Sequence, residues 1–304
     1  MLRRKSEKDA HCRKVEQHIQ ALRNLLSGKR VVALDTCVLG ELEWDVAPPW
    51  FNHFKAMKDD GVRFAIPDLC VGERLECFAN ADPACLTVMK ENWMRMVSRL
   101  DSIIWQDLPC LPLRGDLFDI VGIGERGPRI RRERPFTMGT SQELFKCLHD
   151  YENSRFDAPE FRMPFEEEIE EVRSKWKDRV LAIRAAASGI PKERLLSNIL
   201  VRQAREFFFP GGASDIVELP FRFLIDRAYD SSYCNPDLGK RTMNDGLDHL
   251  ILYLTMASVN VCSTDRFFAQ ARNLGLPQSF CCHTPKTLLE AWEKGALPRV
   301  KVQG

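Results

Sequence analysis

Short apolar runs alternate with helical segments near both ends of the chain, and this alternation limits the folds open to it. Residues 30–34 and 62–67 are rich in β-branched and aromatic side chains, as buried strands are, and residues 68–78 continue the second run with helical spacing. Near the other end, a strand-like run at 259–263 precedes a predicted helix at 267–273. Such alternation favours an α/β fold with a parallel sheet and crossover helices.

The middle of the chain has a different pattern. Long helical segments dominate it, although residues 102–105 are compatible with a short strand. We therefore predict an N-terminal helical extension at 1–29, a core formed by 30–80 and 241–304, and a mainly helical insertion at 81–240.

Composition excludes several classes of protein. The net charge of the 304 residues is +1, which argues against a protein whose whole surface binds nucleic acid but leaves room for a local basic patch. No apolar run has the length of a membrane span, and the basic N-terminus lacks the apolar stretch of a signal peptide. We therefore expect a cytoplasmic protein with no membrane partner.

The 11 cysteines are scattered and contain no CxxC pair, so we expect reduced thiols packed as small apolar side chains. The tightest group is Cys281, Cys282 and His283. Neighbouring residues on a strand point to opposite faces and rarely share a metal, so zinc is not expected there.

Carboxylate side chains recur where the predicted strands end. Asp35 and Asp265 each follow a strand, and ligands of open parallel sheets bind beyond the carboxyl ends of the strands. Two further pairs of acids are spaced three apart on predicted helices and share a face, namely Asp245 with Asp248 and Glu73 with Glu76.

Each acid alone has a simpler explanation as a helix cap, a first-turn acid or part of a solvated face. Together they indicate a cation site, because crowded carboxylates repel one another unless a cation lies between them. Oxygen-rich sites of this kind suit Mg²⁺ or Mn²⁺.

Residues 30–79 and 243–294 resemble the PIN-domain nucleases. The resemblance rests on four motifs in the family's order and on a fitting final helix: VVALDTCVL at 31–39, IPDLCVGERL at 66–75, NDGLDHLI at 244–251, CSTDRFF at 262–268 and HTPKTLL at 283–289. The chain departs from the family in the long helical stretch between the second and third motifs.

The resemblance implies a three-layer α/β/α sandwich with a central parallel sheet, elaborated here by the helical insertion. It also implies cleavage of phosphodiester bonds, usually in RNA, with Mg²⁺ or Mn²⁺. The residues that match the family's acids by position are Asp35, Glu73, Asp248 and Asp265. The supporting positions are Asp245 as an auxiliary ligand, Glu76 as the alternative to Glu73, and Thr36, Asn244 and Thr264 as groups that orient acids or water.

The expected function is therefore a metal-dependent endoribonuclease acting on single-stranded RNA. Arg129, Arg131 and Arg132 lie in a Gly/Pro-rich loop, and Arg241 precedes the third motif, so these arginines are candidates for binding phosphates. Two alternatives stay open: a DNA or structure-specific nuclease, and a non-catalytic PIN scaffold that binds RNA or protein. The insertion also offers a surface for a second copy of the chain or for another protein.

Overall fold

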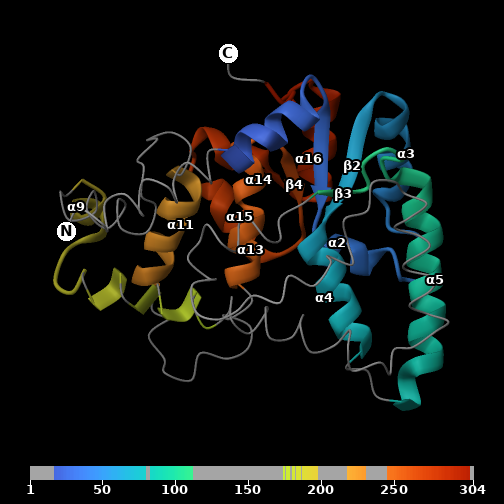
Figure 1. The fold of residues 1–304 in the computed structure, drawn as a ribbon, viewed down its shortest axis with the longest axis horizontal. Helices are drawn as coiled ribbons and strands as arrows, with labels where there is room; N and C mark the ends of the chain where they lie inside the picture. Colours follow the sequence, from blue (N-terminus) through green and yellow to red (C-terminus); the bar gives the residue numbers. More distant parts are fainter. Residues whose placement is uncertain are drawn as a thin grey trace.

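A five-stranded parallel sheet forms the centre of the molecule (Figure 1). The computed structural model describes residues 17–79, 83–111, 218–230 and 245–301, and parts of 174–197. The strand order is β3-β2-β1-β4-β5. The strands are β1 (Arg30–Leu34), β2 (Val62–Pro67), β3 (Cys110–Leu111), β4 (Asn260–Cys262) and β5 (Cys282–His283). The predicted α/β class with a parallel sheet is confirmed.

Helices flank this sheet. Their bounds are α2 (Thr36–Glu41), α3 (Phe51–Asp59), α4 (Asp68–Ala79), α5 (Leu86–Ile103), α9 (Lys192–Ser197), α11 (Glu218–Tyr229), α13 (Asp245–Ile251), α14 (Tyr253–Met256), α15 (Arg266–Asn273) and α16 (Pro285–Glu293). Residues 17–26 are also helical, and η1 (Pro83–Cys85) and η3 (Pro277–Cys281) are short 3₁₀ helices.

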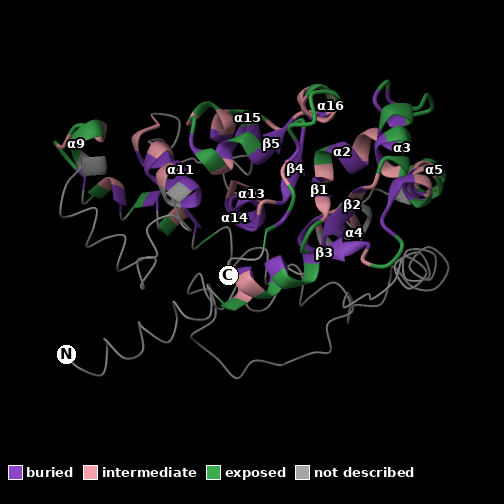
Figure 2. Cartoon of the chain, turned by 90° about the horizontal axis from the view of Figure 1, so that it is seen from above, coloured by how far each residue is buried: buried purple, intermediate pink, exposed green. Residues whose placement is uncertain are grey.

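The helices lie on both sides of the sheet when it is seen from above (Figure 2). On one side Trp292 of α16 donates a 2.8 Å hydrogen bond to Asp60, just after α3. On the other side Arg23 of the helix at 17–26 donates a 2.8 Å bond to the carbonyl of Met256, at the end of α14. This arrangement is compatible with a three-layer α/β/α sandwich.

Strand β1 is the middle of the sheet and of the core. Val31, Val32, Ala33 and Leu34 are all buried, as expected of a strand covered on both faces. Ala33 is aligned with a residue of β2 on one side and with a residue of β4 on the other. The fold therefore joins segments from both ends of the sequence at this strand.

The strand predicted at 102–105 is wrong in its position. Leu100 and Ile103 continue the buried face of α5, so the helix runs to Ile103. Only Ile104 makes an isolated parallel bridge, to Phe64, and the strand itself follows at β3. The sheet thus includes part of the range 81–240, while the division of the chain into three parts stays a prediction.

The two ends of the described core meet beside the start of β1. The backbone N–H of Gly28 donates to the carbonyl of Val300 at 2.9 Å, and the N–H of Val300 donates to that of Lys29 at 3.0 Å. Gly28 ends the first helix with a positive φ of 74°, which glycine adopts without strain. In the part of the chain that the structure describes, no helix combines the length and the apolar character needed to cross a bilayer.

Candidate metal centre

The strand order creates a switch point between β1 and β4. From β1 the chain proceeds to β2 and β3 on one side, and β4 and β5 lie on the other side. Open parallel sheets bind ligands at such a point, beyond the carboxyl ends of the strands. Leu34 is aligned with Cys262 across the two strands, so the next residues, Asp35 and Ser263, meet at this edge.

Asp35 is the most enclosed of the predicted acids, with 1% of its surface exposed. It precedes α2, and its backbone N–H donates to the carbonyl of Cys262 at 3.1 Å. Its carboxylate accepts a 2.6 Å hydrogen bond from the Ser263 hydroxyl. On the opposite side the Cys70 thiol of α4 lies 3.7 Å from the other carboxylate oxygen and donates to it. The side chain is therefore held between the end of β4 and α4.

Glu73 approaches the same point from α4. The hydroxyl of Thr36 donates to one of its carboxylate oxygens at 2.5 Å, which orients the side chain towards the start of α2. Ligand atoms of Asp35, Cys70 and Glu73 all lie within 4.8 Å of one another. One cation placed among them would be within reach of all three side chains.

Asp265 caps α15 at the end of β4. One of its carboxylate oxygens accepts a 2.7 Å bond from the backbone N–H of Phe267, which is the usual role of an N-cap acid. Its own N–H donates to the Ser263 hydroxyl at 2.9 Å. Ser263 therefore links Asp265 to Asp35, and the prediction that both acids lie at one edge of the sheet is met by these contacts.

The charges at this edge act on one another. Burial raises the pKa of Asp35, and the carboxylate of Asp265 raises it further, while the bond from Ser263 lowers it. Burial also raises the pKa of Asp248 of α13 well above its usual range. The neighbouring charges that add to this effect are all carboxylates, those of Asp35, Glu73, Asp265 and Asp245.

The charges of four acids also act on the thiol of Cys37. Desolvation raises the pKa of this thiol, although the residue as a whole is exposed. The carboxylates of Asp35, Asp265, Asp248 and Glu73 raise the pKa further, in that order. The four acids predicted from sequence, carried by four different elements, are therefore all near enough to Cys37 for their charges to act on its thiol.

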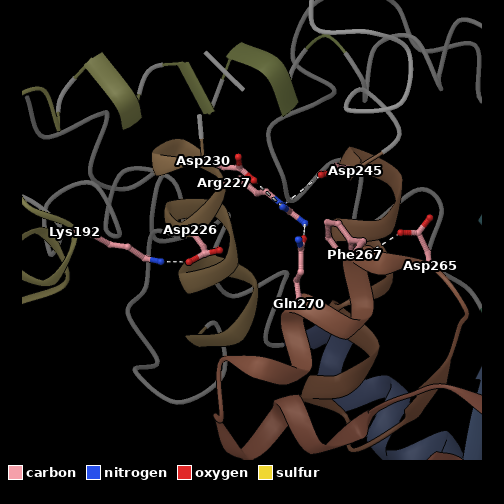
Figure 3. A network of polar contacts seen from close by, with 8 residues as sticks. All are labelled: Lys192, Asp226, Arg227, Asp230, Asp245, Asp265, Phe267 and Gln270. Carbon is pink, nitrogen blue, oxygen red and sulfur yellow. Dashed lines mark hydrogen bonds and ion pairs between the residues drawn. The ribbon is translucent and has the colours of Figure 1, made fainter. Parts of the chain in front are cut away.

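Asp245 belongs to a neighbouring network (Figure 3). Its carboxylate lies 3.3 Å from Nε of Arg227, a residue of α11 that is only 6% exposed. The same guanidinium contacts Asp230 at 3.3 Å and donates to Gln270 of α15. Asp245 thus has a basic partner, while its charge still reaches Asp248.

Arg227 is also enclosed by aromatic rings. Its guanidinium carbon lies 4.5 Å from the ring centre of Phe223 and 5.6 Å from that of Phe267. Phe267 is the residue whose N–H Asp265 caps, so the network extends from α11 to the edge of the candidate metal centre (Figure 3).

The remaining predicted site residues are not gathered in this way. Thr264 is exposed between β4 and α15. The side chain of Glu76 lies outside the described part of the chain, although its helix is described. Five further positions also lie outside the described residues: Asn244, Arg129, Arg131, Arg132 and Arg241.

Sequence reasoning missed Ser263, Cys70 and Cys37. Ser263 directly follows a predicted strand, which is the same signal that identified Asp35, but a single serine there is too common to stand out. Cys70 precedes Glu73 by three residues and so shares its helix face, a signal that a search restricted to acids did not use.

The group at Cys281, Cys282 and His283 has a structural role. His283 is buried, and its ring nitrogen lies 3.1 Å from the amide oxygen of Asn260 in β4. Burial lowers the pKa of His283 to about 4, so the ring is neutral near pH 7. Among the described residues, the group around Asp35 is the one whose ligand atoms are close enough to hold a metal ion.

Comparisons of this chain with models of protein families, with curated proteins and with solved structures found no match.

Proposed function

We propose that this protein is a metal-dependent nuclease of the PIN-like type that hydrolyses phosphodiester bonds in single-stranded RNA. The observation that carries the proposal is that Asp35 and Glu73 lie close together at the switch point of a parallel sheet, with Asp265 linked to Asp35 through Ser263. Asp248 is near enough for the charges of Asp35 and Glu73 to act on its carboxyl group. The residues match the positions of the family's acids in the sequence motifs.

The donor set fits a divalent cation. Burial and mutual repulsion raise the pKa of Asp35 and of Asp248, so ionising all the carboxyl groups of this enclosed place is unfavourable without a cation. A cation at this point would relieve that repulsion. Oxygen donors favour Mg²⁺ or Mn²⁺, and Asp35, Glu73, Asp248 and Asp265 are the residues that would hold it.

The protein fixes these groups before any substrate arrives. Ser263 and Cys70 hold the Asp35 carboxylate from two sides, and Thr36 orients Glu73. Asp265 is held by its cap to Phe267. When bound, the cation would lower the pKa of a water and neutralise charge on the phosphate oxygens. The chain's own part is to keep the acids in place around that water and the phosphate.

Cleavage of a mixed pool of labelled single-stranded RNA and DNA tests the proposal. The wild-type protein and Asp265→Asn are compared with Mg²⁺, with Mn²⁺ and with EDTA. Asp59→Asn is the matched control, because Asp59 is an exposed acid at the end of α3. It precedes the start of β2 and so lies near the amino ends of the strands, away from the candidate metal centre. We expect metal-dependent cleavage of RNA by the wild type and the control, and its loss in Asp265→Asn.

Other outcomes separate the alternatives. Cleavage of DNA in preference to RNA would make the protein a DNA nuclease with the same centre. Absence of cleavage together with absence of Mn²⁺ binding by calorimetry would refute the nuclease and favour a non-catalytic scaffold.

A further inference from the structure

An exposed tryptophan stands on the segment that follows α2. Trp44 is 55% exposed and Val46 80% exposed, whereas Leu42, just before them, is fully buried. Large aromatic side chains bury much apolar surface when they find a partner, so Trp44 offers a large area for contact with a ligand.

Two arginines of α5 fix the backbone of this segment. Arg99 donates to the carbonyl oxygens of Leu42 at 2.9 Å, Trp44 at 2.5 Å and Asp45 at 3.0 Å. Arg95 donates to the carbonyl of Glu43 at 2.6 Å. The four consecutive carbonyl groups of residues 42–45 thus all accept hydrogen bonds from arginines of α5. The backbone that carries the Trp44 side chain is therefore well ordered.

The same segment is tied to the candidate metal centre. The Glu43 carboxylate forms an ion pair with Arg74, the residue directly after Glu73 on α4. Helix α2 separates Trp44 from Thr36, which bonds Glu73, and its six residues span about 9 Å at about 1.5 Å per residue. Trp44 is therefore joined to the candidate metal centre by one short helix and by the Glu43–Arg74 ion pair.

The charges around the segment largely cancel. Arg74 pairs with Glu43, and Arg95 lies 2.9 Å from the carboxylate of Asp45. Arg99 donates to carbonyl oxygens, which leave its positive charge in place. Glu41, at the end of α2, accepts from the neutral ring N–H of Trp50 and keeps its negative charge. The case for Trp44 therefore rests on its exposed ring and its ordered backbone, with Arg99 as a cation held beside it.

We propose that Trp44 is a stacking platform for an unpaired base of the nucleic acid whose backbone enters the candidate metal centre. This inference rests on the proposed function and adds the residue that would hold a base of the single-stranded substrate next to the site of cleavage. An aromatic ring can stack on any base, and a backbone segment that is already ordered loses little conformational entropy on binding. The charge of Arg99 suits the phosphate that accompanies that base.

Binding of a short fluorescent single-stranded RNA to the full chain in EDTA tests this, because no cleavage is needed for the readout. We expect Trp44→Ala to weaken binding by roughly 5- to 100-fold, the range for loss of one stacked base, and Trp44→Phe to restore most of it. Phe280→Ala is the matched control, since Phe280 is also an exposed aromatic residue, with 61% of its surface exposed. It lies on η3, directly before the start of β5, and so near the amino ends of the strands rather than at the candidate metal centre.

A strand with abasic sites separates stacking from a purely structural effect. We expect abasic RNA to bind the wild type more weakly, and Trp44→Ala to weaken abasic RNA no further. Equal affinity of Trp44→Ala and wild type for the intact strand would overturn the proposal and assign Trp44 to a protein contact. If Trp44→Ala binds RNA as tightly as the wild type but the wild type shows metal-dependent cleavage, the nuclease proposal stands. If the wild type shows no cleavage but Trp44→Ala still weakens RNA binding, only the nuclease proposal is refuted.

Discussion

Replacement of Ser263 by alanine removes two hydrogen bonds from one buried atom. The hydroxyl donates to the Asp35 carboxylate at 2.6 Å and accepts from the backbone N–H of Asp265 at 2.9 Å. Ser263 is 1% exposed, so water cannot readily take its place. Both partners would be left unsatisfied at the edge of the sheet.

The magnitude follows from the type of each bond. A hydrogen bond to a charged group contributes about 1.5–3 kcal/mol and a neutral one about 0.5–1.5 kcal/mol, so Ser263→Ala should lower the free energy of unfolding by roughly 2–4.5 kcal/mol. Ser279→Ala is the control. Ser279 is equally buried, but its hydroxyl accepts a single neutral backbone bond, from the N–H of Leu276 at 3.3 Å, and about 0.5–1.5 kcal/mol is expected there.

Urea unfolding near neutral pH without metal measures both variants. Burial raises the pKa of Asp35, so the folded state holds the proton more tightly and stability falls as pH rises above the usual Asp range. The bond from Ser263 limits this loss, and its removal should therefore matter most when Asp35 is ionised and least in acid.

A double-mutant cycle with Asp35→Asn isolates the charged bond. The cost of Ser263→Ala should shrink in the Asp35→Asn background and at acid pH. A cost no larger than that of Ser279→Ala, or one unaffected by Asp35→Asn, would refute this account of the centre.

Three further predictions concern Asp248, Arg227 and His283. Asp248→Asn should stabilise the metal-free protein near neutral pH, because the raised pKa of Asp248 makes its ionised form unfavourable in the folded state; thermal shift should show this gain together with a smaller stabilisation by Mn²⁺ than in the wild type. Arg227→Met should lower the free energy of unfolding by about 1–3 kcal/mol, since it leaves the partly buried carboxylates of Asp245 and Asp230 without their basic partner; a loss well below about 1 kcal/mol, typical of exposed ion pairs, would contradict this. His283→Gln should abolish an acid-dependent loss of stability: because burial lowers the pKa of His283 to about 4, its contribution is full above about pH 6.5 and is lost as the pH falls towards 4, which urea unfolding across that range would reveal.

The acids at strand ends were predictable because two simple rules locate them. The apolar runs at β1 and β4 define strands, and a parallel sheet places the ends of its strands at one edge. Asp35 and Asp265 follow from these rules alone. Glu73 required only that α4 begin directly after β2, which the helical spacing of residues 68–78 indicated.

The partners of these acids could not be predicted from local pattern. The contact between Ser263 and Asp35 depends on the register of two strands whose residues are 228 positions apart. The pairing of Asp245 with Arg227 depends on how α11 packs against α13, and helical periodicity gives no such information. The position of β3 was missed because α5 keeps its buried face up to Ile103, into the range 102–105 that was compatible with a strand.

The pairing of β1 with β4 also sets the order in which the centre can be assembled. During synthesis Asp35 and Glu73 leave the ribosome early, and β1 can pair with β2 at once. Closing the long loop to β4 carries an entropic penalty of about 5 kcal/mol for the 228 residues that separate Ser263 from Asp35, and it must await the synthesis of β4. Until then Asp265 is not linked to Asp35, so under the proposed function the nascent chain would complete its cation site, and become able to cut RNA, only when β4 joins the sheet.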